Sequence, residues 1–167
     1  MKQTEEKTRK IYRELTELLI RENRTVSSME SCTGGLIASL LTDTEGASLV
    51  VRGGIMSYCN EAKIRFGVPK SLIGTYGVYS AETAKAMAET AQKQFLTEIG
   101  IGVTGTFRNA DPANSDSVPG KVYVVMLGDF GIREIELTVP LELDRNSAKF
   151  FVARVAAEEL LLSLRGQ

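Results

Sequence analysis

The sequence predicts a single α/β domain: a mainly parallel sheet with an antiparallel edge hairpin and helices on both faces (an α/β sandwich). Strand-like segments alternate with segments of helical apolar spacing, an order typical of parallel sheets. Late in the chain, two strand-like segments are separated only by the turn residues GDFG, which predicts a hairpin. The length of 167 residues suits one self-sufficient core, and no linker or repeat divides it. We therefore expect one domain over residues 1–167.

The first part of the chain predicts helices and strands in alternation. The expected elements are a helix over 4–23, a strand over 25–30, a helix over 34–42, a strand over 48–59 and a helix over 60–66. The first helix is predicted because its apolar residues share one helix face, at Ile11, Leu15, Leu18 and Leu19. Gly53 and Gly54 indicate a bulge or a close backbone approach in the second strand. Asn60 is the expected cap of the helix that follows.

The second part continues the alternation and ends on a helix. We expect a loop with a helical turn over 67–80, a helix over 81–95, a strand over 98–105, a loop over 106–120, two strands within 121–139 and a helix over 146–165. Ser80 is placed to cap the helix over 81–95, with Glu82 in its first turn. Either Asp144 or Asn146 is placed to cap the last helix.

Composition excludes several classes of function. The chain has 20 Lys and Arg against 21 Asp and Glu, a net charge of −1, so no basic nucleic-acid footprint is expected. It has no histidine and only two distant cysteines, which predicts neither a metal site nor a disulfide framework. The N-terminus lacks the apolar region of a signal peptide, and no apolar run reaches the roughly 18 residues of a membrane span. We expect a cytoplasmic protein without nucleic-acid or membrane partners and without a cofactor.

Chemistry is expected where the parallel strands end, because ligands of such sheets bind beyond the carboxyl ends of the strands. Three segments follow the predicted strands there: ESCTGG, SYCNEAK and VTGTFRNADPANSDSVPG. All three are rich in hydroxyls, glycines and small polar groups. Their convergence indicates a site more strongly than any one of them does.

The first segment offers two nucleophiles, Ser31 and Cys32. Amides of Thr33, Gly34 and Gly35 at the start of the next helix would suit a phosphate or a developing oxyanion. The alternative interpretation is a capped turn without chemistry. Buried free cysteine is common, so Cys32 is also open to a role in the core.

A serine nucleophile needs a base, and without histidine Tyr58 and Lys63 are candidates in the second segment. They converge if Tyr58 ends the strand and Lys63 falls in the first turn of the following helix. The helix dipole and burial would then both lower the lysine pKa, as a base requires. The alternative for Lys63 is a solvated surface lysine. A dehydrogenase Tyr-x-x-x-Lys pair does not fit, since the spacing is one residue too long and the glycine motif is missing.

The segments ESCTGG, SLVVRGGIMSYCNEAKIRFGVP, YGVYSAETAKAMA and GVTG, in this order, resemble the CinA C-terminal domain family. The resemblance covers about residues 8–163. The family includes PncC, the nicotinamide mononucleotide deamidases of NAD recycling. It implies an α/β sandwich, a homo-oligomer and metal-independent hydrolysis of the carboxamide of this small-molecule nucleotide to the acid and ammonia.

The resemblance also implies roles for single residues. Ser31 would be the nucleophile, and Lys63 and Tyr58 would handle its proton. The remaining motif positions are expected to bind substrate, at Glu30, Thr33, Gly34, Gly35, Thr104, Gly105, Thr106 and Arg145. Arg145 belongs to an Asp-Arg pair before the last helix and is expected to bind the phosphate or an adjacent subunit. A surface turn is the alternative for that pair.

One segment departs from the family pattern. After VTG the family continues with Ile-Ala-Gly-Pro and a glycine-rich loop, whereas this chain has the bulkier, charged loop TFRNADPANSDSVPG. The reaction class depends on Ser31, Tyr58 and Lys63, but the identity of the substrate depends partly on this loop. A related pyridine nucleotide, another amide, or a non-catalytic ligand- or protein-binding domain therefore remain alternatives.

Overall fold

The computed structural model describes residues 2–166, which form one five-stranded sheet in the order β2-β1-β3-β4-β5. The strands are β1 (Val26–Glu30), β2 (Val51–Met56), β3 (Ile99–Gly105), β4 (Lys121–Gly128) and β5 (Gly131–Thr138). β1 pairs in parallel with β2 and β3, whereas β3–β4 and β4–β5 are antiparallel pairs. The predicted mixed sheet with an antiparallel edge hairpin is therefore confirmed.

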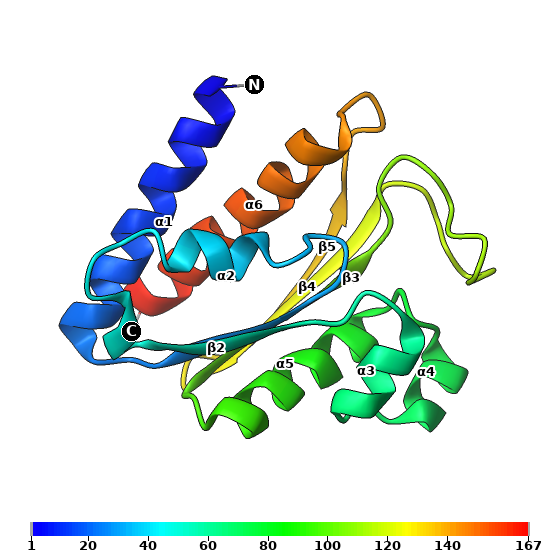
Figure 1. Ribbon diagram of the computed structural model, residues 1–167, viewed down its shortest axis with the longest axis horizontal. Helices are drawn as coiled ribbons and strands as arrows, with labels where there is room; N and C mark the ends of the chain where they lie inside the picture. The colour runs from blue at the N-terminus through cyan, green and yellow to red at the C-terminus, as the bar shows by residue number, and fades with distance from the viewer. Residues whose placement is uncertain (1, 167) are drawn as a thin grey trace.

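Helices cover both faces of the sheet, as predicted (Figure 1). On one face lie α1 (Lys2–Glu22), α2 (Leu36–Leu41) and α6 (Arg145–Arg165). On the other lie α3 (Asn60–Phe66), α4 (Lys70–Tyr76) and α5 (Ala81–Phe95). A short 3₁₀ helix, η1 (Ala47–Leu49), leads into β2. No helix within residues 2–166 is both long enough and apolar enough to cross a membrane.

Strand β3 shows how the two faces are packed. Its residues Ile99, Ile101 and Val103 belong to the main core together with residues of α1 and α6. The alternate positions, Gly100 and Gly102, face α5. A Cβ at Gly102 would lie 1.9 Å from the carbonyl oxygen of Ala84, and one at Gly100 would lie 2.4 Å from that of Ala88. Without side chains there, α5 packs directly on the centre of the sheet.

Gly53 and Gly54 combine both roles predicted for them. The β1–β2 register shifts beside them, from Val26 opposite Val51 to Ser27 opposite Gly53. A Cβ at Gly53 would lie 2.2 Å from the ring of Phe95. Both the bulge and the close approach are therefore confirmed.

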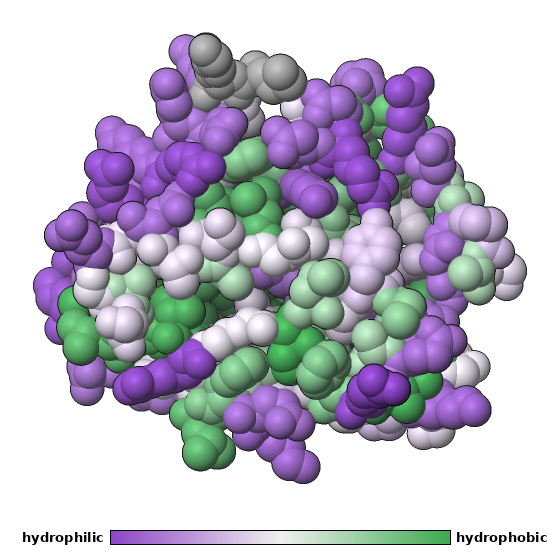
Figure 2. All heavy atoms as spheres, viewed as in Figure 1, coloured by the Kyte–Doolittle hydropathy of each residue, from purple (hydrophilic) through white to green (hydrophobic). Residues whose placement is uncertain are grey.

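The surface along β2 is partly hydrophobic. Hydrophobic residues reach the surface in the band where this edge strand crosses the view (Figure 2), and Met56 in β2 is exposed. The last turn of η1 adds the exposed Leu49. The predicted homo-oligomer stays a prediction.

Several element boundaries differ from the predicted ones. The second strand is only six residues long, and residues 70–76 form a true helix where we expected a loop with a turn. Asn60 is the first residue of α3 rather than its cap, and its side-chain amide donates to Asn114. Asp144, rather than Asn146, caps α6 by accepting the N–H of Ser147.

Candidate active site

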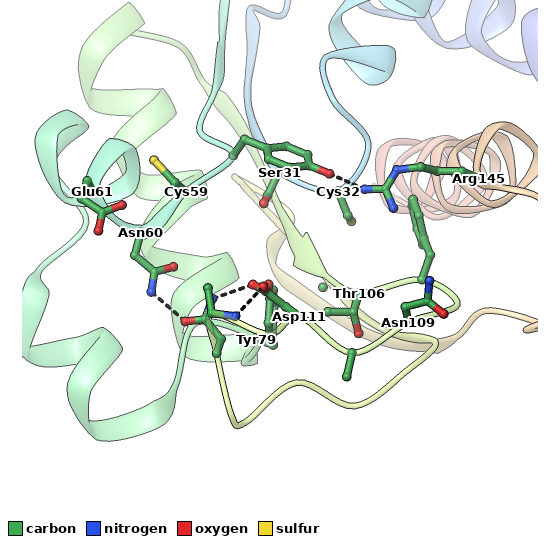
Figure 3. A pocket seen from close by; sticks show the side chains of 16 residues that line it. Ser31, Cys32, Cys59, Asn60, Glu61, Tyr79, Thr106, Asn109, Asp111 and Arg145 are labelled. Atoms are coloured by element: carbon green, nitrogen blue, oxygen red, sulfur yellow. Dashed lines mark hydrogen bonds between the residues drawn. The ribbon is translucent and has the colours of Figure 1, made fainter.

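The carboxyl ends of β1, β2 and β3 meet at one edge of the sheet, and a cavity of about 440 Å³ opens there (Figure 3). The predicted site residues that line it are Ser31, Tyr58, Gly105, Thr106 and Arg145. Lys63 is outside the lining but contacts Ser31. The predicted residues with no part in the lining or in this contact are Glu30, Thr33, Gly34, Gly35 and Thr104. The expected convergence of the three segments is confirmed.

Ser31 and Lys63 form a buried pair beneath this cavity. The exposed fractions of their surfaces are only 5% and 1%. Lys63 Nζ donates to Ser31 Oγ at 3.1 Å and to the Ser57 carbonyl oxygen at 2.8 Å. The Ser31 amide donates to the carbonyl oxygen of Val103, which fixes the serine to the end of β3. Both side chains are therefore held in place, with the Lys63 amine in hydrogen-bond contact with the Ser31 hydroxyl.

Burial makes Lys63 an amine that can lose its proton near neutrality. Desolvation is the largest cause and lowers the pKa of Lys63 to about 8, and the negative charge of Asp111 acts in the opposite direction. The predicted contribution of the helix dipole to this shift is wrong. Lys63 is the fourth residue of a two-turn helix and lies in its last turn, where a dipole favours a cation.

Cys32 is unsuited to nucleophilic attack. It is 4% exposed and belongs to the main core cluster. Burial, with the nearby charge of Glu30, raises the pKa of the Cys32 thiol to about 12. Since the thiolate is the nucleophilic form, the thiol stays inert at neutral pH. This geometry favours Ser31 over its neighbour.

Glu30 has a different place from the predicted one. It is buried at the end of β1, and its carboxylate accepts the N–H groups of Gly35, Ile37 and Ala38 at 2.8–3.1 Å. The Ser28 hydroxyl adds a fourth donor at 3.2 Å. Glu30 thus caps the amino end of α2 from inside the protein, and its carboxylate does not line the cavity.

The turn amides are also arranged differently from the expectation. Gly34 and Gly35 adopt positive φ angles of 64° and 90°, so α2 begins only at Leu36. The Gly34 N–H donates to the carbonyl oxygen of Ser31, and the Gly35 N–H donates to Glu30. These two amides are therefore occupied. The Thr33 side chain is buried, and its hydroxyl has no partner among the residues that the structure describes.

Of the predicted residues at the end of β3, Thr104 makes a structural contact away from the cavity, whereas Gly105 and Thr106 line the cavity. The Thr104 hydroxyl donates to the carbonyl oxygen of Val78, which ties β3 to the segment before α5. A Cβ at Gly105 would lie 2.5 Å from the Lys121 carbonyl oxygen, so β4 packs against it directly. Thr106 lines the cavity and donates its hydroxyl hydrogen to the carbonyl oxygen of Val118.

Arg145 lies at the mouth of the cavity between two aromatic residues. Its guanidinium donates to the hydroxyl of Tyr58 and lies 5.5 Å from the centre of the Phe107 ring (Figure 3). Tyr58 is 57% exposed, and its hydroxyl makes no hydrogen bond to Ser31 or Lys63. The structure therefore brings Ser31 to Lys63 and Tyr58 to Arg145.

The loop over residues 106–120 carries a polar network that the sequence did not predict. Asp111 accepts hydrogen bonds from the hydroxyl of Tyr79, from the side chain of Asn114 at 2.6 Å and from the N–H of Ala113 at 2.9 Å. The side chain of Asn60 donates to Asn114 at 2.7 Å. The Asp-Pro-Ala-Asn-Ser composition signalled a loop, but no pattern in it pointed to partners in α3 and before α5.

The fold and this site define a class of α/β sandwich domains with a buried serine–lysine pair at the carboxyl edge of the sheet. Residues 8–164 match the model of the CinA C-terminal domain, so the chain belongs to this family.

Individual relatives agree with this assignment. A CinA-like protein of Gemmatimonas aurantiaca is 35% identical over 147 residues, which cover 87% of this chain and 33% of the relative. The chain thus spans about a third of the length of the curated relatives it matches.

Solved structures show the same fold. The competence/damage inducible protein CihA from Agrobacterium tumefaciens superposes with a TM-score of 0.84 at 28% identity, over 93% of this chain and 94% of that one. A CinA superfamily protein from Klebsiella pneumoniae gives a TM-score of 0.87 at 18% identity, over 96% and 99%.

Proposed function

We propose that this chain is a metal-independent amide hydrolase that converts nicotinamide mononucleotide, or a close relative, to the corresponding acid and ammonia. The observation that carries the proposal is the contact between Lys63 Nζ and Ser31 Oγ in a buried setting that lowers the lysine pKa. A hydroxyl beside an amine whose pKa is about 8 has the parts of a nucleophile and its base. Family membership and the cation at the cavity mouth support the choice of a nucleotide amide.

The proposed first half-reaction starts from neutral Lys63. Ser31 Oγ attacks the carboxamide carbon while Lys63 Nζ takes the hydroxyl proton. Negative charge develops on the amide oxygen. The N–H group of Cys32, in the turn after Ser31, donates to no backbone oxygen in the described part of the chain, and Cys32 lines the cavity, so this N–H is our candidate to stabilise it. When the C–N bond breaks, the proton on Lys63 passes to the leaving nitrogen and ammonia departs.

The second half-reaction returns the enzyme to its starting state. Water attacks the acyl ester on Ser31, and Lys63 accepts a proton from this water. The C–O bond to the serine then breaks, the acid is released and Ser31 Oγ regains its proton from Lys63. In this scheme Lys63 is the base, and the predicted part of Tyr58 in the proton transfers is untested. We propose a different role for Tyr58, which is to orient Arg145 toward the phosphate of the nucleotide.

An ammonia-release assay on purified protein with nicotinamide mononucleotide tests the proposal, with Ser31→Ala as the matched control. Release that requires Ser31 supports an amide hydrolase. Tight binding of the nucleotide to the parent protein without any release of ammonia would favour the alternative, a non-catalytic binding domain.

A further inference from the structure

The cavity wall opposite Ser31 carries charge that the proposed reaction does not use. Of the residues that line the cavity, Glu61 and Asp111 are acidic, whereas Arg145 is the basic one. In Figure 3, Asp111 and Tyr79 lie across the cavity from Ser31, away from Arg145. The cavity therefore has a cationic mouth beside Arg145 and an anionic wall at Asp111.

Asp111 is held in a fixed position as an ionised group. The Tyr79 hydroxyl, the Asn114 amide and the Ala113 N–H all donate to its carboxylate, and these hydrogen bonds lower the pKa of Asp111, with Tyr79 contributing most. Asn114 is held in turn by Asn60. A carboxylate with three donors stays ionised at neutral pH, and its orientation is set by the loop and α3 together.

The charge of Asp111 also reaches the reacting groups. It acts to raise the pKa of Lys63, and Lys63 acts to lower that of Asp111, so the two groups interact across the cavity. When the amide carbon of a substrate lies at Ser31, the ring that carries the amide lies within reach of the negative charge of Asp111. A cationic ring beside the Asp111 carboxylate is stabilised by the opposite charge, whereas a neutral ring is not.

We infer that Asp111 is a specificity-determining residue that selects carboxamides carried on a positively charged ring over those on a neutral ring. The inference rests on the proposed function, since it assumes that an amide occupies Ser31. The chemical class it defines is an N-substituted pyridinium carboxamide. Selectivity of this kind discriminates between the oxidised nucleotide and its dihydropyridine form, which share the carboxamide, ribose and phosphate and differ in ring charge.

Binding to the Ser31→Ala variant tests the inference without turnover. Isothermal calorimetry would compare nicotinamide mononucleotide with its reduced, neutral-ring form. We expect the oxidised form to bind about five- to tenfold more tightly, the size expected for one partly solvent-screened charge pair. Adding Asp111→Asn, which keeps the shape and a hydrogen-bonding oxygen, should bring this ratio close to one.

Asp116→Asn is the matched control, because Asp116 is a carboxylate of the same loop that does not line the cavity. It should leave the ratio unchanged. If Asp111→Asn only loosened the loop, the affinity for both nucleotides would fall equally. The ratio of the two affinities therefore distinguishes a loss of charge selectivity from a structural effect.

A ratio near one in the Ser31→Ala parent, or a ratio unaffected by Asp111→Asn, would overturn the inference. If unmodified protein also releases ammonia from the oxidised nucleotide, the proposed function survives that result. If neither nucleotide binds and no ammonia is released, both proposals fail.

Discussion

The two walls of the cavity differ in how their side chains are held. On the wall formed by β1, β2 and α3, Ser31 and Lys63 are almost completely buried and are fixed by backbone carbonyls. On the exposed wall, at the mouth of the cavity, Tyr58 follows β2 and Arg145 begins α6, and both side chains are exposed and contact mainly other side chains. Burial on the first wall changes the chemistry of a lysine, whereas the second wall offers charge and shape to a ligand from solvent.

This difference separates rate from recognition. A desolvated amine costs folding free energy, and that cost is tolerated where the neutral form is used. Exposed groups are screened by water and contribute graded amounts to binding. We therefore expect substitutions on the buried wall to act on kcat or on folding, and those on the exposed wall to act on KM and substrate choice.

The largest effect is expected from Ser31→Ala. It should lower kcat by at least about 10³-fold with the fold intact, because only the attacking oxygen is lost. Cys32→Ala is the neighbouring control and should stay within about threefold of the parent, since its thiol is protonated and lies in the core. Steady-state ammonia release measures both. An inactive Cys32→Ala beside an active Ser31→Ala would move the nucleophile by one residue.

Lys63→Arg should reduce kcat by about 10²- to 10⁴-fold, close to the effect of Lys63→Ala. Guanidinium keeps the positive charge but stays protonated, so it cannot accept the serine proton. Nucleotide affinity, measured by calorimetry, should change less than kcat. Substantial turnover by Lys63→Arg would instead make Lys63 a fixed cation, and Tyr58 would become the candidate base.

The rate of the unmodified protein should rise with pH with a midpoint near 8, the value to which burial lowers the Lys63 pKa. The sign follows from the active form: below this pH the amine is protonated and has no lone pair to accept a proton. Profiles of kcat between pH 6 and pH 10 (roughly the span of a single titration on either side) measure the midpoint. A flat profile, or a midpoint at the ordinary lysine value of about 10.4, would contradict a desolvated base.

Glu30→Ala tests whether the buried wall depends on its internal cap. Removing the carboxylate leaves three N–H groups at the amino end of α2, those of Gly35, Ile37 and Ala38, without their acceptor and should lower the free energy of unfolding by about 2–4 kcal/mol. Glu30→Gln keeps one acceptor oxygen and should cost less. Urea denaturation compares the three proteins. Unchanged stability in Glu30→Ala would show that water replaces the cap without loss.

The smallest effect is expected from Arg145→Ala, on the exposed wall. It should raise KM for nicotinamide mononucleotide about tenfold with little change in kcat, as expected for one solvent-exposed contact to a phosphate. Arg108→Ala removes an exposed arginine of the neighbouring loop that does not line the cavity, and it should leave KM unchanged. A fall in kcat without a change in KM would assign Arg145 to the chemistry instead.

Much of the fold could be predicted because its signals are local. Helical spacing in α1, the turn residues between β4 and β5 and the Ser80 cap of α5 each depend on neighbours in the chain. The boundaries that were predicted wrongly involve residues whose partners are far away in the sequence. Asn60, the expected cap, lies inside α3, and its side chain bonds instead to Asn114, 54 residues further on.

The candidate site divides in the same way. Sequence alone determined that a hydroxyl follows the first strand, that no histidine could serve it and that a lysine follows the second strand. Only the tertiary structure decided that Lys63 is buried in contact with Ser31, that Glu30 caps α2 and that Asp111 lines the cavity. Periodicity and turn chemistry act between near neighbours, but the solvation and partners of a charged side chain are set by segments far apart in the chain, and those come together only when the sheet is assembled.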